Sequence, residues 1–496
     1  MIALVNITSK FRGVEDTTRP PSGLLYLGNS LKKAGYEVTV FHIVENEIDE
    51  TVEKIINLKP SYVGFSVFTG YPCYTSSIMS KKIKERNSNI PVIWGGIHPS
   101  LTPEECLKEK FIDLVVIGEG EETILELSQE LLGNHNYENI KGIGYKKAGA
   151  IKINPRRELI ANLDNYKMDW SLVNINNYIR PGSDNEKTLC FITSRGCPFN
   201  CGFCYNEKFN NRKCRAHSID FVINEVKALK EKTGITRISF DDDHFMVNIK
   251  RGFSILSELK KIGITCDWME FHLDFVTNEN MEKLADLGVK RIFFGWESGN
   301  NRILKLINKH FTKEIILDKC KILAKFPNIN YDASAIIGFP TETWKDVAIT
   351  IDTALEMAEI LPNVNFNLGT YMPYPGTPLY NLTIKEGFNP PTNVEGWKEF
   401  DMLEGKVNID WLPWANIKTK KIFSLIDAYA KCLDVPKKMS EKKSMFKRTG
   451  KLFLYFLAKW RLKRKFFLFP FEIYFYALWM KKSIARNIKK FKTSNN

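Results

Sequence analysis

Three cysteines within eight residues are the most chemically informative feature of the sequence. Cys197, Cys201 and Cys204 lie in the stretch TSRGCPFNCGFCY, and their C-x3-C-x2-C spacing lets one short loop bring three thiolates to a single metal centre. Cubane iron–sulfur clusters normally take four cysteine ligands. A cluster held by three leaves one iron open to a small molecule. A structural zinc site, with Cys214 or His217 as the fourth ligand, is the alternative.

Composition places these cysteines in a large intracellular protein. A chain of 496 residues with 44% hydrophobic content is long enough for two to four domains with sizeable cores. The first residues, Ile-Ala-Leu-Val after Met1, are typical of a strand rather than of a signal peptide. We therefore expect a reducing cytoplasm, in which thiols stay free to bind metal and disulfides are absent.

The net charge of +14 is concentrated at one end of the chain. Residues 442–496 hold 16 of the 71 Lys and Arg residues and a single acid, Glu472, so the rest of the chain is close to neutral. We expect no nucleic-acid partner, because no base-stacking or groove-reading module accompanies the basic tail.

The first 150 residues alternate short apolar runs with helical patterns. Strands are predicted at 2–6, 37–43, 61–67, 91–94 and 113–117, with helices at 22–34 and 73–86 among those between them. This alternation predicts a Rossmann-like, doubly wound parallel sheet, which binds ligands beyond the carboxyl ends of its strands. Small and polar residues follow the predicted strand ends, namely Ser66, Thr69, Gly95, Gly96, His98, Gly118, Glu119 and Gly120.

A second alternation covers residues 187–385, after a polar, Asn-rich stretch at 151–186 that we interpret as an ordered linker. Six strands are predicted, at 188–193, 236–241, 265–271, 290–296, 330–337 and 364–370. The strand ends carry Asp241 and Asp242, then Glu297, then Ser334 and Gly338. Because adjacent carboxylates repel one another, the acidic loop Asp241–Asp243 should meet a cation or several donors, unless it is simply exposed.

The cysteine motif, with the aromatic Phe203 before its last cysteine, resembles the signature of the radical S-adenosylmethionine (SAM) superfamily, as does the stretch Gly-Trp-Glu-Ser-Gly at residues 295–299. The resemblance implies an open, six-unit β/α barrel. It also implies a [4Fe–4S] cluster on Cys197, Cys201 and Cys204. SAM would bind the open iron and lie near Phe203, Asp241, Asp242, Glu297, Ser334 and Gly338.

The glycine loops of the first 150 residues, taken in order, resemble the cobalamin-binding domain that precedes many radical SAM barrels. The resemblance implies that Ser66, Thr69, Gly95, Gly96, His98, Gly118, Glu119 and Gly120 contact cobalamin. The Asp-x-His-x-x-Gly motif that ligates cobalt in other cobalamin proteins is missing, because Phe68-Thr-Gly-Tyr-Pro72 stands at its place. We therefore expect His98 to lie near the nucleotide tail rather than to bind cobalt.

Residues 386–496 are predicted to form a helical region that ends in a basic, aromatic tail. Its longest apolar run has about fifteen residues and contains Pro470 and Glu472, too short and too interrupted to cross a bilayer. Aromatic faces flanked by basic clusters favour a helix that lies in an anionic membrane interface. A tail that packs on the protein with a solvated basic face is the alternative.

The resemblance implies an enzyme that generates a 5′-deoxyadenosyl radical and, most simply, methylates an unactivated carbon with methylcobalamin. Oxidative ring closure, as in the anaerobic cyclase of chlorophyll synthesis, is the close alternative, and a non-catalytic cobalamin-binding regulator is an alternative of another class. We expect a small-molecule or lipid substrate, an electron donor such as flavodoxin or ferredoxin, and a cytoplasmic protein attached peripherally to an anionic membrane.

Overall fold

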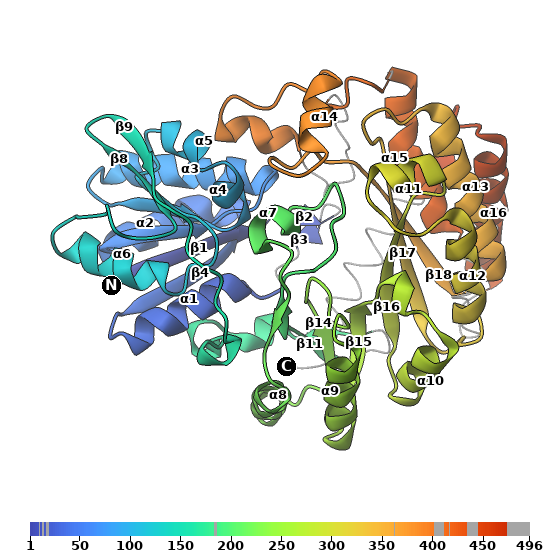
Figure 1. Cartoon of the computed structure of the whole chain (residues 1–496), viewed down its shortest axis with the longest axis horizontal. Helices are drawn as coiled ribbons and strands as arrows, with labels where there is room; N and C mark the ends of the chain where they lie inside the picture. Colours follow the sequence, from blue (N-terminus) through green and yellow to red (C-terminus); the bar gives the residue numbers. More distant parts are fainter. Residues whose placement is uncertain are drawn as a thin grey trace.

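Two α/β domains stand side by side in the computed structural model, with the cysteine loop between them (Figure 1). The structure describes residues 1–8, 10–11, 14–15, 19–182, 186–361, 363–400, 411–415, 417–433 and 445–473. Residues 474–496, which belong to the predicted basic tail, lie outside this range.

The N-terminal domain is built on a seven-stranded sheet in the order β4-β1-β5-β6-β7-β8-β9. Its strands are β1 (Ile2–Thr8), β4 (Val38–Val44), β5 (Tyr62–Ser66), β6 (Val92–Gly95), β7 (Leu114–Val116), β8 (Ile143–Lys147) and β9 (Ala150–Ile153). The first five pair in parallel and match the five predicted strands. The helices are α1 (Ser22–Lys33), α2 (Ile48–Leu58), α3 (Tyr71–Arg86), α4 (Ile97–Leu101), α5 (Pro103–Lys108) and α6 (Thr123–Leu132). A short antiparallel pair, β2 (Lys10–Phe11) and β3 (Val14–Glu15), follows β1.

The β8–β9 hairpin was not predicted, and it extends the sheet past the expected domain boundary at residue 150. Its tight turn places Ala148 and Gly149 at φ 48° and 80°, the left-handed geometry that suits a two-residue hairpin. The N-terminal sheet therefore ends at Ile153, so the boundary at 150 falls at the start of β9.

The linker is ordered by three 3-10 turns, η2 (Leu163–Asn165), η3 (Trp170–Leu172) and η4 (Ile175–Tyr178). Each turn follows a side-chain cap, from Asn162, Asp169 and Asn174, that accepts a backbone N–H two residues ahead. Asp169 also pairs with Lys32 of α1 at 2.6 Å, so the linker is attached to the first domain before it enters the second.

The second domain is a curled sheet in the order β10-β11-β14-β15-β16-β17-β18. The short β10 (Arg180–Pro181) is antiparallel, whereas β11 (Lys187–Phe191), β14 (Arg237–Phe240), β15 (Thr265–Glu270), β16 (Arg291–Glu297), β17 (Asn330–Ile337) and β18 (Val364–Thr370) are parallel. These six strands confirm the predicted partial barrel. The covering helices include α8 (Ile219–Thr233), α9 (Ile249–Lys261), α10 (Asn278–Asp286), α11 (Asn301–Leu306), α12 (Lys313–Leu323) and α13 (Trp344–Ile360), and η5 (Leu273–Phe275) follows β15.

The C-terminal region closes the outer edge of this barrel. After α14 (Tyr380–Lys385) and η6 (Val394–Glu399), α15 (Ile417–Cys432) lies along β18, where Asp427 accepts the N–H of Leu368 at 3.0 Å. Helix α16 (Met445–Arg464) packs outside α13 and α15 (Figure 1). The edge strand β18 is thus covered by a helix rather than left to pair with another chain. No helix of the described residues is both long and apolar enough to cross a membrane.

Candidate active site

The cysteine loop starts where β11 ends and is fixed there by two acids of the neighbouring strand end. Asp242 follows β14 and accepts hydrogen bonds from the backbone and hydroxyl of Thr193 and from the hydroxyl of Ser194, at 3.1, 2.8 and 2.5 Å. Asp243 accepts the N–H of Gly196 at 2.8 Å. These contacts hold the first half of the loop before its first cysteine.

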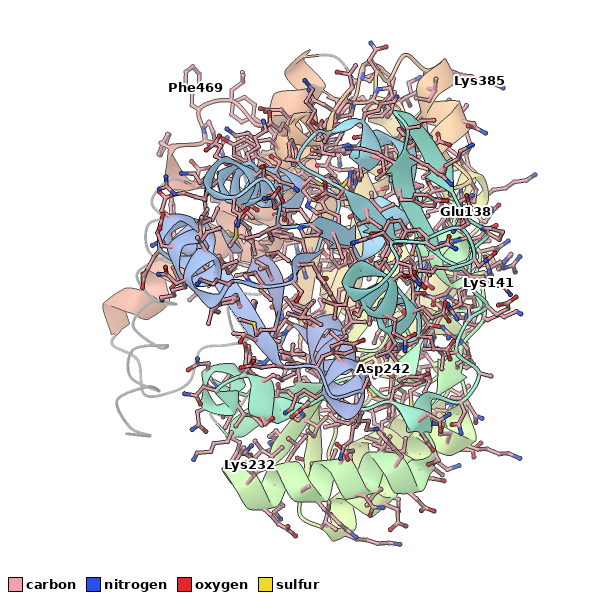
Figure 2. All side chains as sticks on the ribbon, turned by 90° about the vertical axis from the view of Figure 1, so that its left-hand side faces the viewer. Glu138, Lys141, Lys232, Asp242, Lys385 and Phe469 are labelled. Carbon is pink, nitrogen blue, oxygen red and sulfur yellow. The ribbon has the colours of Figure 1, made fainter. Side chains whose placement is uncertain are left out.

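In the structure the acidic loop supports the start of the cysteine loop. Both carboxylate oxygens of Asp242 are occupied by Thr193 and Ser194, and burial raises the pKa of Asp242 to about 6. Figure 2 shows Asp242 inside the molecule. Asp241 is partly exposed and lies 3.8 Å from Arg19. Because β14 is the direct neighbour of β11, its acids reach the cysteine loop first, and SAM contact by Asp241 and Asp242 stays a prediction.

The three thiols share one half-buried location. Burial raises the pKa of Cys197 and Cys204 to about 12, and also that of Cys201, where the nearby Lys309 works in the opposite direction. Without metal these groups remain protonated thiols at neutral pH. Metal binding must therefore supply the free energy that deprotonates them, as is usual for thiolate ligands.

The alternative of a zinc site lacks a fourth ligand. His217 is held by Asp164 Oδ1 at 3.0 Å and by the Tyr26 hydroxyl at 3.2 Å, so both ring nitrogens are engaged. Burial raises the pKa of the Cys214 thiol, and the charges of Asp242 and Arg251 act on it in opposite directions. Within the described residues, no three His, Cys, Asp or Glu side chains surround one point as a single ion requires. A cubane takes one thiolate per iron and suits thiols spread along a loop.

Glu297 ends β16 in a strained conformation that explains the glycine before it. Its backbone φ is 60°, in the left-handed region, and its carboxylate folds back over Gly295. A Cβ at Gly295 would lie 2.1 Å from Glu297 Oε1. The Gly-x-Glu spacing therefore places a buried carboxylate at the strand end, and backbone strain of this kind is typical of functional sites.

Lys309 is the buried cation that faces this carboxylate. Its Nζ lies 3.3 Å from Glu297 Oε1, and burial opposes the charge while Glu297 and Cys201 hold the pKa of Lys309 above its usual value. Burial raises the pKa of the nearby Glu270 to about 8. A buried acid beside a buried base complements a zwitterion, so Glu297 and Lys309 fit the ammonium and carboxylate of SAM.

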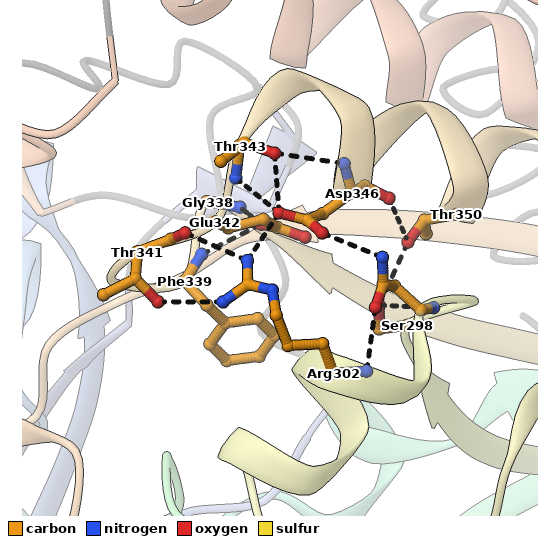
Figure 3. A network of polar contacts seen from close by, with 10 residues as sticks. Ser298, Arg302, Gly338, Phe339, Thr341, Glu342, Thr343, Asp346 and Thr350 are labelled. Atoms are coloured by element: carbon orange, nitrogen blue, oxygen red, sulfur yellow. Dashed lines mark hydrogen bonds and ion pairs between the residues drawn. The ribbon is translucent and has the colours of Figure 1, made fainter.

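The turn after β17 is stabilised by a polar network (Figure 3). Glu342 accepts the N–H groups of Gly338 and Phe339 at 2.5 and 3.1 Å, and burial raises the pKa of Glu342 to about 8. Arg302 of α11 donates to Thr341 and to Asp346, which caps α13. The φ of Gly338 is 86°, where a side chain would be strained and would meet Leu412 of the C-terminal region at 2.7 Å.

Ser334 lies on the inner face of the barrel. Along β17 it and Ile336 are half-buried, whereas the residues on either side of each are buried, so the two share the less covered face. Ser334 pairs in register with Gly295 of β16, two residues before Glu297. Phe203 packs on Phe339 with ring centroids 5.8 Å apart, which brings the cysteine loop to the Gly338 turn. Glu297, Ser334, Phe203 and Gly338 are therefore gathered at the carboxyl ends of β16 and β17.

In the N-terminal domain, one of the predicted glycines faces open space. At Gly118, with φ 87°, an added Cβ meets no atom within 4 Å. At Gly96 it would meet the backbone of Val67 at 3.0 Å, and at Gly120 it would meet Leu27 at 3.0 Å. Gly96 and Gly120 thus allow close packing, at Gly95 an added Cβ would make only ordinary contacts from 3.6 Å, and Gly118 leaves room that suits a bulky ligand such as cobalamin.

His98 is fully buried and engaged on both ring nitrogens. Thr69 Oγ1 and Thr102 Oγ1 each lie 3.3 Å from one of them, and burial lowers the pKa of His98 to about 3. Trp397 of η6 stands edge-on to its ring at 5.4 Å. This environment agrees with the expectation that His98 is not a cobalt ligand. Ser66 is half-buried at the end of β5, and its contact with cobalamin stays a prediction.

Glu119 has its carboxylate committed to the contact between the domains. Arg195, two residues before the first cysteine, pairs with Glu119 at 2.9 Å and with Glu121 at 2.6 Å. Arg215 pairs with Glu119 at 2.6 Å, and the backbone of Ile160 donates to the same carboxylate. The Gly118–Glu121 loop is thereby attached to the cysteine loop, and cobalamin contact by Glu119 and Gly120 stays a prediction.

The histidines of the barrel support the cysteine loop. His272 stacks on Phe199, which lies between the first two cysteines, with ring centroids 4.0 Å apart. His244 also stacks on Phe199, at 5.6 Å between centroids. His310 contacts Asn200 Oδ1 at 3.3 Å. Its side chain therefore reaches the cysteine loop. Four other cysteines, Cys190, Cys266, Cys320 and Cys432, are buried.

Comparison with known proteins agrees with this geometry. Residues 191–354 match the radical SAM superfamily and residues 16–128 match the B12 binding domain. The chain is 32% identical over 410 residues to the uncharacterized methyltransferase PH0819 of Pyrococcus horikoshii, covering 82% of this chain and 86% of that protein. The chain belongs to this family of B12-binding radical SAM proteins. Its cofactors are a [4Fe–4S] cluster, SAM and cobalamin.

More distant relatives of the family differ in their named reactions. The anaerobic magnesium-protoporphyrin IX monomethyl ester cyclase of Rubrivivax gelatinosus is 28% identical over 374 residues, covering 73% of this chain and 66% of the cyclase. Among solved structures, the cobalamin-dependent radical enzyme OxsB with aqua-cobalamin has a TM-score of 0.67 at 19% identity, covering 93% of this chain and 72% of OxsB. TsrM of Kitasatospora setae with cobalamin and a [4Fe–4S] cluster has a TM-score of 0.62 at 18% identity, covering 76% and 77%. These likenesses support the fold.

Sequence reasoning missed several residues of this B12-binding radical SAM site: Arg195, Glu270, Lys309 and Glu342. The sequence offered a signal for Glu342, because it lies four residues after Gly338 and just before α13. Lys309 had none, because its partner Glu297 stands twelve positions away across a helix. Glu270 occupies a strand end like the predicted acids, so its position alone was the available signal.

Proposed function

We propose that this protein is a cobalamin-dependent methyltransferase that modifies an unactivated carbon of a hydrophobic, lipid-like substrate. The relationship to PH0819 supports methyl transfer. When bound, the cluster with SAM supplies a radical that removes hydrogen from carbon, and cobalamin supplies a methyl group. The chain's own residues have to hold these groups and the substrate next to each other.

The contact between the two domains is the observation that carries this proposal. Phe68, after β5, meets Tyr205, directly after the last cysteine, with ring centroids 6.3 Å apart. Arg195 links the Gly118–Glu121 loop to the same cysteine loop. The predicted cobalamin edge and the cluster site therefore adjoin one space. A group can pass from one site to a substrate activated at the other without a large domain movement.

The inner face of the barrel supports a hydrophobic substrate. Trp268 of β15 and Phe293 of β16 are half-buried on the inward-facing positions, with ring centroids 5.9 Å apart. Phe68 adds an aromatic ring, 49% exposed, at the domain junction. Such a lining excludes water from the reacting carbon, while Glu297 and Lys309 orient the charged end of SAM.

Oxidative ring closure is a second candidate, favoured by the likeness to the anaerobic cyclase. The same cysteine loop and Glu297 serve either reaction, so the outcome depends on whether the methyl group reaches the substrate. For either reaction we propose flavodoxin or ferredoxin as the electron donor. We also propose a cytoplasmic protein that works while attached to the inner face of an anionic membrane.

The test is anaerobic turnover with methyl-deuterated SAM. Reconstituted protein with cobalamin and a low-potential reductant is incubated with a total lipid extract, and products are followed by mass spectrometry. We expect 5′-deoxyadenosine, S-adenosylhomocysteine and a lipid that carries the label, all absent with Cys201→Ala.

The same measurement separates the alternatives. Deoxyadenosine together with an unlabelled product that has lost two hydrogens would favour ring closure. Absence of deoxyadenosine from a protein with a full cluster would favour a regulator. Label found only in water-soluble products would overturn the proposed substrate class.

A further inference from the structure

Helix α16 turns aromatic side chains toward solvent. Phe453, Phe456 and Trp460 follow a spacing of three and four residues, which places them on one face, and Phe453 is 65% exposed. The opposite face, with Ala458 and Leu462, is buried against the barrel. A surface helix of a globular protein normally carries polar residues on its outward face.

A loop after α16 continues this apolar face. Phe466, Leu468, Phe469 and Phe471 are exposed, and Phe469 reaches 78% exposure. Figure 2 shows Phe469 at the rim of the molecule, pointing away from it. We define the aromatic surface as these four residues with Phe453, Phe456 and Trp460. Seven large apolar side chains exposed within nineteen residues indicate a binding surface rather than scattered exposure.

A buried arginine fixes the loop with its side chains outward. Arg461 donates to the carbonyls of Phe466, Leu468 and Phe469 at 3.3, 2.7 and 3.0 Å. It also pairs with Glu472, whose carboxylate accepts the Tyr429 hydroxyl at 2.5 Å. Three backbone carbonyls are thus satisfied from within, which lowers the cost of moving the loop into an apolar medium.

Three contacts place the loop beside the barrel mouth. Lys459 pairs with Glu359 and Lys465 with Asp352 further up α13, so α16 runs antiparallel to α13. Phe467 then meets Trp344, the first residue of α13, at 6.3 Å between ring centroids. Because α13 starts after β17 at the carboxyl ends of the strands, the aromatic loop lies at the level of the active-site opening.

The cations beside the aromatic surface favour an anionic partner. In the sequence, residues 442–496 contain 16 basic residues and one acid, Glu472. That acid is buried in its pair with Arg461, so it presents no negative charge outward. Lys463 and Arg464, at the end of α16, are exposed between the helix stripe and the loop. Aromatic side chains with neighbouring cations match the interface of a bilayer that contains anionic lipids.

We propose that the aromatic surface docks into the interfacial layer of an anionic lipid bilayer and sets the barrel mouth against it. This inference deepens the proposed function, on which its purpose rests, by naming the elements that would admit a lipid-like substrate from the membrane. The docking itself needs neither substrate nor turnover, so it can be tested separately.

The test is sedimentation of the full-length protein with sucrose-loaded vesicles. Vesicles of phosphatidylcholine with phosphatidylglycerol are compared with phosphatidylcholine alone, at low and high salt. We expect binding to the anionic vesicles that weakens with salt. Leu468→Ser/Phe469→Ser/Phe471→Ser should weaken this binding by about tenfold or more, because three inserted side chains are lost.

A matched triple variant controls for general loss of surface hydrophobicity. Leu132→Ser/Ile315→Ser/Ile384→Ser removes three side chains that are also exposed but lie outside the aromatic surface. It should bind vesicles like the wild type. The proposal is overturned if the wild type stays in the supernatant, if both triple variants bind equally, or if the surface instead mediates self-association that light scattering detects and vesicles do not compete with. Cleavage of SAM by every variant in detergent-free buffer reports separately on the proposed function.

Discussion

The carboxyl strand ends of the two sheets carry different kinds of side chains. The barrel ends carry acidic and basic groups in contact, above all Glu297 with Lys309, and acids that hold the cysteine loop. The N-terminal ends carry glycines and hydroxyls, and their acids Glu119 and Glu121 are consumed by Arg195. SAM is a small zwitterion that needs paired charges, whereas cobalamin is bulky and mostly lined by neutral amides, so it needs room. The two kinds of strand end therefore match the different needs of the two ligands predicted to bind there.

Loss of one cysteine should have the largest effect on the barrel side of this comparison. Cys201→Ala should abolish the [4Fe–4S] cluster and SAM cleavage, because two thiolates cannot hold a cubane. Iron and sulfide content and electron paramagnetic resonance report the cluster. Cys214→Ala is the control and should leave it intact, since the predicted ligands are the three cysteines of the loop. Stoichiometric zinc lost on changing Cys214 would contradict the radical mechanism.

Removing the buried cation should be the next most severe change. Lys309→Gln leaves Glu297 buried without its partner, so we expect a loss of about 3–5 kcal/mol in the free energy of unfolding and weaker SAM binding. Lys313→Gln breaks a more exposed pair with Glu356 and should cost less than about 1 kcal/mol. Urea denaturation and equilibrium dialysis with SAM measure both. Equal losses for the two variants would refute the distinction.

On the N-terminal side, filling open space should affect cobalamin alone. Gly118→Ala adds a methyl group where nothing lies within 4 Å, and we expect it to weaken cobalamin binding by about tenfold or more while SAM cleavage persists. Gly35→Ala carries the same backbone strain, at φ 88° against 87°, and also points into open space. It should bind cobalamin normally. Equal affinity in both variants, followed by absorbance titration, would move the cofactor away from Gly118.

The free energy of unfolding should also change with pH through Glu342. Burial raises the pKa of Glu342 from its usual 4.5 to about 8, so the folded protein keeps a proton that the unfolded chain has lost between these values. The free energy of unfolding therefore falls as pH rises through this window. Glu342→Gln removes this contribution, and its stability should improve relative to wild type by at most about 1.4 kcal/mol per pH unit. If urea denaturation gave the same difference in free energy of unfolding between the two proteins at every pH from 5 to 8, the prediction would be contradicted.

The parallel strands could be predicted from the sequence because they are either continuous apolar runs, as in β1, or alternate apolar with polar residues, as in β18. β17 and β18 were located to the residue, and the others to within two. The β8–β9 hairpin escaped because its strands are short and partly exposed, and because Ala148 replaces the usual turn residue. Length and burial therefore decided which elements the sequence could reveal.

The site was predictable where local spacing creates chemistry and not where distant residues meet. Cys197, Cys201 and Cys204 lie on one loop, and Glu297 depends on Gly295 two positions before it. The use of Asp242 by Thr193, by contrast, joins residues 49 positions apart and depends on which strands become neighbours. Sequence indicates a group's chemistry, whereas the pairing of strands decides its partner.

The pair between Arg195 and the acids Glu119 and Glu121 joins a part of the chain that is synthesised early to one that is synthesised later. The N-terminal sheet is complete at Ile153, so it can fold on the ribosome before the cysteine loop emerges, as domains commonly do. Its two acids are then already in place when Arg195 appears. The first domain would then offer Arg195 a folded partner as the cysteine loop emerges.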